Sequence, residues 1–164
     1  MEAIWASAVA VVGTLLGAVT TQVFQRLAAR RTEAFARAEA LRQERMATYS
    51  AFAAAVEEYR HGQATRWYGR REGPEGEGFR AARDEAHRLR TAARQALYRV
   101  ELLTDDREVV GAAREAYRAA WEVSTAREQV EHDARDTRAR EAVETFVTRA
   151  APLVRGAADG AAAP

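Results

Sequence analysis

The feature that most constrains this chain is an uncharged stretch near its N-terminus, which runs from Ala3 to Gln25. As a helix that rises about 1.5 Å per residue, it would reach roughly 35 Å, enough to cross a hydrocarbon core of about 30 Å. Trp5 stands near one end, where an indole ring favours the headgroup zone. The stretch therefore predicts a single membrane-spanning helix over residues 1–25.

The charged residues around this stretch predict its orientation. Only Glu2 precedes it, whereas Arg26, Arg30 and Arg31 follow it at once. Because basic residues concentrate on the cytoplasmic side of a membrane span, we expect the N-terminus outside and everything after Phe24 in the cytoplasm. The expected location is the inner membrane, with the lipid bilayer as one partner. Two alternatives stay open, a buried core helix of a soluble oligomer and a cleaved signal peptide, although signal peptides carry their positive charge before the apolar stretch.

Small residues recur along one face of the expected membrane helix. They are Ala6, Ala10, Gly13 and Gly17. They alternate at spacings of four and three, and the pair Gly13 and Gly17, four apart, lets two membrane helices approach closely, so this face predicts self-association and a homo-oligomer. The alternative is a lone helix whose glycines have no such role.

The composition of the chain limits both its fold and its chemistry. The 164 residues include no cysteine, which excludes disulfides and thiolate metal sites, and the net charge is only +1. Such a balance argues against a dedicated nucleic-acid binder, which would need a basic excess on one face. Ala, Arg and Glu dominate, and this mixture favours an all-α fold.

Beyond the uncharged stretch, the chain continues without a proline or a loop signal as far as His61. This part includes the run Arg42-Gln-Glu-Arg45-Met-Ala-Thr-Tyr49-Ser-Ala-Phe52. A small-residue span followed by this Arg-rich segment resembles a group of uncharacterised small single-pass membrane proteins with helical cytoplasmic domains, frequent in high-GC bacteria. The resemblance covers residues 1 to about 60 and implies a topology but no activity.

Apolar residues at spacings of three and four predict four cytoplasmic helices, at about residues 26–68, 79–103, 106–130 and 137–151. The clearest apolar stripe is in the second of these helices and consists of Phe79, Ala82, Ala86, Leu89, Ala93, Ala96, Val100 and Leu103. Asp105, with Glu108 three residues later, predicts the N-terminal cap of the third helix, and Pro152 predicts the end of the fourth helix or a kink in it. Short connections favour antiparallel neighbours. Residues 26–155 should therefore form an up-down bundle with coiled-coil-like packing, followed by a disordered tail over residues 156–164.

Three histidines are the candidates for chemistry. In an up-down bundle, His61, His87 and His132 would lie toward the same end, and Glu58 and Asp84 stand three residues before the first two. Such pairs hold metals in some bundles, but the expected third and fourth helices offer no clear inward carboxylates. No serine lies in a nucleophile motif. We therefore expect no cofactor and no enzyme activity.

These observations favour a membrane-anchored helical scaffold or interaction protein, which presents a cytoplasmic bundle to an unknown protein partner and self-associates. Two alternatives remain. One is a metal-binding bundle enzyme or sensor that uses the three histidines, and the other is a membrane-active small protein such as a toxin or pore component.

Overall fold

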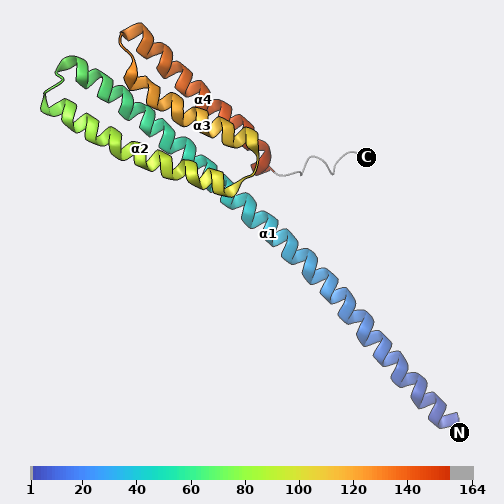
Figure 1. Ribbon diagram of the computed structural model, residues 1–164. Coiled ribbons are helices and arrows are strands. Elements are labelled where there is room, and N and C mark those ends of the chain that lie inside the picture. Colours follow the sequence, from blue (N-terminus) through green and yellow to red (C-terminus); the bar gives the residue numbers. More distant parts are fainter. Residues whose placement is uncertain (1, 156–164) are drawn as a thin grey trace. The chain divides into compact units, whose positions relative to one another are not determined.

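The computed structural model describes the backbone of residues 2–155 and the side chains of residues 32–155. Within these limits the chain is all-α and contains no strand (Figure 1). Its elements are α1 (Glu2–Glu72), α2 (Glu77–Leu103), α3 (Arg107–Glu122), the short 3₁₀-helix η1 (Val123–Thr125) and α4 (Gln129–Arg155). The chain divides into two compact units, residues 1–41 and 42–164.

In the first unit, the described side chains belong to residues 32–41 of α1. Phe35 is 74% exposed and Leu41 is 39% exposed. Arg37 lies 4.0 Å from Glu33 one turn earlier, a spacing that modestly stabilises a helix. Phe35 and Leu41, the large apolar side chains of this segment, are therefore both exposed.

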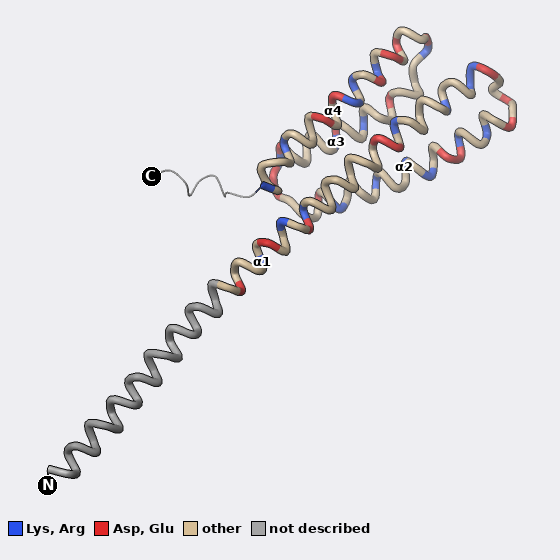
Figure 2. Tube along the Cα trace, turned by 180° about the vertical axis from the view of Figure 1, so that it is seen from behind, with Lys and Arg blue, Asp and Glu red and all other residues tan. Residues whose placement is uncertain are grey.

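The second unit is a bundle of four antiparallel helices, the last part of α1 with α2, α3 and α4 (Figure 1). All four helices contribute to one core. Its buried members are Tyr49, Phe52, Val56 and Tyr59 from α1, Leu89, Ala93, Leu97 and Val100 from α2, Val109, Ala113, Ala116 and Ala120 from α3, and Val143, Phe146, Ala150 and Val154 from α4. Charged residues of both signs are interspersed along the four helices (Figure 2). This pattern confirms the expected all-α bundle.

Large and small side chains alternate across this core. The α3 helix presents mainly alanines, which are almost fully buried and let its neighbours approach closely. The aromatic rings of α1 fill the remaining space. Phe146 of α4 meets Phe52 edge-on, with ring centroids 4.7 Å apart, and meets Tyr49 in the same way at 5.9 Å. Edge-to-face contacts of this kind add to the gain from burial.

The third and fourth helices differ from the predicted ranges 106–130 and 137–151. The α3 helix ends at Glu122, and α4 already begins at Gln129. The polar stretch that suggested a break is helical because the Glu131 carboxylate accepts a hydrogen bond from the Arg127 backbone N–H, at 2.7 Å, and caps the new helix. This bond also lowers the pKa of Glu131.

The outer limits of the other helices also differ from the prediction. The α1 helix continues to Glu72 and α2 begins at Glu77, two residues before the expected Phe79. Pro152 lies inside α4, which runs on to Arg155. The helix continues past this proline because Val154 is buried in the core.

The cap of α3 lies one residue later than predicted. Asp106, not Asp105, is the N-cap, and its Oδ1 accepts hydrogen bonds from the N–H groups of Glu108, at 2.9 Å, and Val109, at 3.2 Å. The preceding Thr104 is buried, and its hydroxyl accepts a bond from the Asp106 N–H at 3.2 Å. Burial of Thr104 fixes the connection and so decides which aspartate reaches the helix end.

The end of α1 holds the connection between α3 and α4. The Trp67 indole is fully buried, and its N–H donates to the Ala126 carbonyl at 2.8 Å. Arg70 donates to the carbonyls of Ser124 and Ala126, both at 3.2 Å. These bonds satisfy backbone groups that the break between α3 and α4 leaves unpaired.

Candidate interaction groove between α1 and α4

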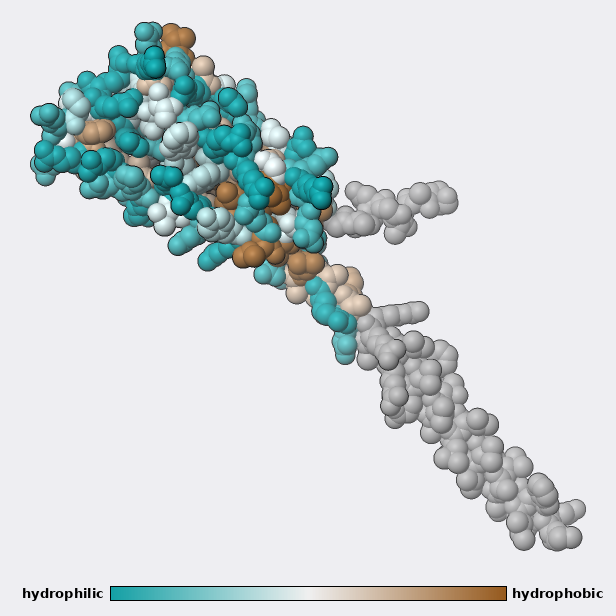
Figure 3. Space-filling model, in the orientation of Figure 1, coloured by the Kyte–Doolittle hydropathy of each residue, from teal (hydrophilic) through white to brown (hydrophobic). Residues whose placement is uncertain are grey.

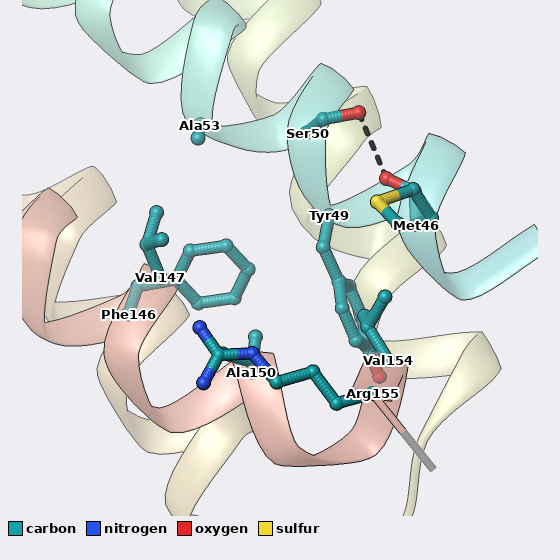
Figure 4. A pocket seen from close by; sticks show the side chains of 10 residues that line it. Met46, Tyr49, Ser50, Ala53, Phe146, Val147, Ala150, Val154 and Arg155 are labelled. Atoms are coloured by element: carbon teal, nitrogen blue, oxygen red, sulfur yellow. Dashed lines mark hydrogen bonds between the residues drawn. The ribbon is translucent and has the colours of Figure 1, made fainter. Parts of the chain in front are cut away.

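An apolar groove of about 400 Å³ runs between α1 and α4 in the second unit (Figure 4). Its lining residues are Met46, Tyr49, Ser50 and Ala53 from α1, and Phe146, Val147, Ala150, Ala151, Val154 and Arg155 from α4. We call this feature the α1–α4 groove. Its volume lies within the range of typical ligand pockets.

The groove exists because small residues face each other across two neighbouring helices. Ala53 on α1 and Ala150 on α4 leave space that larger side chains would fill. The buried ring of Phe146 lies behind this space, while Met46 and Val147, each about half exposed, stand at its rim. The sequence therefore builds an apolar hollow whose walls are rigid core residues.

Charged side chains lie beyond one end of the groove. There Arg60 bonds to Asp136 across the two helices and to Glu57 at 2.9 Å. Burial of Arg60 opposes its charge, but the hydrogen bonds that Arg60 donates to Asp136 and Glu57 outweigh that effect and raise the pKa of Arg60. This cluster joins α1 to α4 on the side of the groove that lies toward the α1–α2 turn.

The other end of the groove carries a single positive charge. Arg155, the last residue of α4, lines the groove, and Figure 4 shows its side chain extending back along the helix. Within residues 32–155, no carboxylate forms an ion pair with it. The groove therefore combines apolar walls with one cationic end.

Comparison with known proteins assigns the bundle to a family. A family model described as KilB plasmid transfer protein matches residues 46–154, which is more than half of the chain. The chain belongs to the KilB plasmid transfer protein family. The KilB match spans parts of all four bundle helices and every residue of the α1–α4 groove except Arg155. No curated protein and no solved structure matches the chain.

The three histidines of this KilB-family chain lie in different environments. His61 and His87 are exposed, whereas His132 is only 4% exposed and lies against the Trp67 ring, with centroids 4.3 Å apart. Across residues 32–155, no three His, Asp or Glu side chains come together in a way that could hold a metal ion. His132 therefore serves the packing of α1 on α4, and the hypothesis of a histidine metal site gains no support from the structure.

The membrane predictions fall outside the described side chains. The structure does not describe the side chains of residues 1–31. This range contains the small residues Ala6, Ala10, Gly13 and Gly17, the flanking Arg26, Arg30 and Arg31, and the predicted boundary at residue 25. Within the described residues of the KilB-family chain, no helix is long and apolar enough to span a bilayer. The tail over residues 156–164 is also outside the described range. These predictions, like the alternative of a membrane-active protein, therefore stay predictions.

Sequence reasoning did not find the groove, although one signal was present. Val147 follows Phe146 on α4 and is 49% exposed, because Phe146 alone occupies the core position. On α1, Met46, Tyr49 and Ala53 follow one another at spacings of three and four. Two apolar stripes on one helix, rather than one, are the sequence signal of an additional apolar surface.

Proposed function

We propose that this KilB-family chain is a membrane-anchored helical scaffold that acts in plasmid transfer. In this proposal it self-associates and holds a protein partner at the cytoplasmic face of the inner membrane. The observation that carries the proposal is the family match, because it covers the bundle and nearly all of the α1–α4 groove. The uncharged stretch from Ala3 to Gln25, with Arg26 behind it, supports the anchor and its orientation.

The proposed occupant of the α1–α4 groove is a helix of the partner protein. Recognition of a helix in a groove uses apolar side chains on one face, and the walls of this groove are almost entirely apolar. Arg155 at its end calls for an acidic residue on the partner helix, since complementary charge fixes the register of such a contact. The partner helix should thus carry an apolar stripe that ends in Asp or Glu.

A matched pair of variants tests this function. Val147→Glu places a charge at the groove rim, whereas Thr148→Glu places the same charge on an exposed neighbour outside the groove. We expect Val147→Glu to lower the frequency of plasmid transfer between cells, because a partner's apolar side chains cannot pack on a carboxylate. Thr148→Glu should transfer normally. Thermal unfolding of both proteins must match the wild type, and equal transfer by the two variants would contradict the proposal.

Site-specific cross-linking identifies the occupant. A photoreactive residue at Met46, on the groove rim, is compared with one at Arg149, which lies on α4 outside the groove. In cells that carry the plasmid, Met46 should cross-link to an apolar helix of another protein with an acidic residue near its end, and Arg149 should not. A cross-link from Met46 only to a second copy of this chain would contradict a separate partner.

A further inference from the structure

A second hollow, of about 460 Å³, lies on the opposite pair of helices, α2 and α3. It is lined by Arg90 and Leu97 from α2 and by Arg114, Tyr117, Arg118 and Trp121 from α3. We call it the α2–α3 hollow. Whereas a single arginine lines the α1–α4 groove, three arginines and two aromatic side chains line this hollow, and no carboxylate does.

The register of the two helices determines how these side chains are distributed. Arg94 of α2 donates to the Tyr117 hydroxyl at 3.4 Å, and Arg114 pairs with Glu101 of α2 at 2.7 Å. Because the helices are antiparallel, moving one turn from Arg94 toward the start of α2 brings Arg90 opposite Trp121. One end of the hollow therefore brings together a guanidinium and an indole.

Two aromatic side chains line the hollow: Tyr117 is held by packing, and Trp121 is partly exposed. The Tyr117 ring stacks on the buried Tyr59, with centroids 5.6 Å apart and an interplanar angle of 27°. Burial raises the pKa of Tyr59 to about 12, so the Tyr59 ring stays neutral at physiological pH. Trp121 is 45% exposed, which leaves a large aromatic surface available beside the hollow. An exposed indole next to arginines is a typical platform for stacking a base.

The arginines of the hollow keep donor capacity for an anion. Arg114 and Arg118 each pair with one carboxylate, from Glu101 at 2.7 Å and Glu115 at 3.1 Å. A guanidinium has five N–H donors, so one ion pair orients it without exhausting it. Arg90 contributes a third guanidinium to the same wall. Three arginines against two carboxylates give the hollow a local positive excess.

We propose that the α2–α3 hollow binds a nucleotide, with its phosphate on the arginines and its base against Trp121. The same chemistry serves a free nucleotide or one unit of a single strand of nucleic acid. The net charge of +1, from which we expected no nucleic-acid partner, is a property of the whole chain, and a site of this size needs only a local excess. The inference does not depend on the membrane anchor or on the α1–α4 groove.

Fluorescence polarisation of two labelled probes tests the proposal, with the full chain in nanodiscs. One probe is AMP with a dye on its ribose, and the other is a dye-labelled single-stranded oligothymidylate. Saturable binding of AMP would assign the site to free nucleotides as well as strands, and binding of the oligonucleotide alone would assign it to a strand. No saturable binding of either probe would overturn the proposal.

Variants locate the binding on the hollow. Trp121→Ala should weaken binding about tenfold, while Trp121→Phe, which keeps an aromatic ring, should retain most of it. Arg118→Gln should weaken binding and flatten its dependence on salt. The control is Arg149→Gln, an exposed arginine of α4 that pairs with Glu108. Binding that survives Trp121→Ala unchanged, or that falls equally with Arg149→Gln, would contradict the site.

Discussion

At the scale of single residues, Gly62 shows how closely two helices of the bundle approach. It lies inside α1, toward the C-terminal end of that helix, and is buried, and a Cβ atom added there would come within 2.5 Å of Leu89 Cδ1 on α2. Glycine inside a helix costs roughly 1 kcal/mol relative to alanine. A glycine is explained at this position because Leu89 occupies the space that a larger side chain would need.

Two glycine substitutions should have opposite effects on stability. Gly111 lies on the exposed side of α3 with nothing within 4 Å of an added Cβ, so Gly111→Ala should raise the free energy of unfolding by about 0.5–1 kcal/mol. Gly62→Ala should lower it, because displacing the buried Leu89 costs about 1–3 kcal/mol, more than the helix gains. Urea unfolding followed by circular dichroism measures both. Stabilisation by both substitutions would show that Leu89 can move aside freely.

At the scale of elements, the start of α3 depends on a single carboxylate. Asp106 caps two backbone N–H groups, whereas Asp105 is exposed and makes no cap. Asp106→Ala should therefore lower the free energy of unfolding by about 1 kcal/mol, and Asp105→Ala should change it little. The same urea titration separates them. Equal losses would mean that both aspartates act only through their charge near the helix end.

Elements were predictable from the sequence where one apolar stripe decides their position. Ala86, Leu89, Ala93 and Val100 of α2 were all expected inward and are all buried. The start of α4 was not predictable in this way, because it depends on the Glu131 cap and on the connection between α3 and α4. That connection accepts a hydrogen bond from Trp67 of α1, which is far away in the sequence.

The two candidate sites depend even more on the folded arrangement. The α1–α4 groove forms because Ala53 and Ala150, on two different helices, both leave space. The apolar pattern of one helix alone does not show which small residues of another helix lie near it. The α2–α3 hollow likewise depends on the register that brings Arg90 opposite Trp121.

At the scale of the whole molecule, the bundle is complete without the N-terminal stretch. Every buried core residue that the structure describes lies between Tyr49 and Val154. We therefore expect deletion of residues 1–25 to give a soluble and still helical protein, while the full chain fractionates with membranes. Cell fractionation and circular dichroism measure this. Recovery of the full chain from the cytosol without detergent would contradict the membrane anchor.

Self-association through the N-terminal stretch has its own test. Replacing Gly13 and Gly17 together with Ile should hold two membrane helices apart and weaken oligomers. The same replacement at Val12 and Leu16, one position around the helix, should have little effect. Cross-linking in detergent compares the two double variants. Identical cross-linking would exclude the glycines from the contact and leave any oligomer to the bundle.

The contacts of α1 with the later helices also set the order of events during synthesis. Trp67 can form its hydrogen bond to Ala126 only after 59 further residues have been synthesised, and Arg60 can bond to Asp136 only after 76. A ribosome that adds about 5–20 residues per second needs roughly 4–15 s to cover the longer interval. For that time the nascent first helix carries Phe52 and Trp67 without their α4 partners. The emerging chain is thus a natural client for chaperones that bind exposed apolar segments, until its last helix leaves the ribosome.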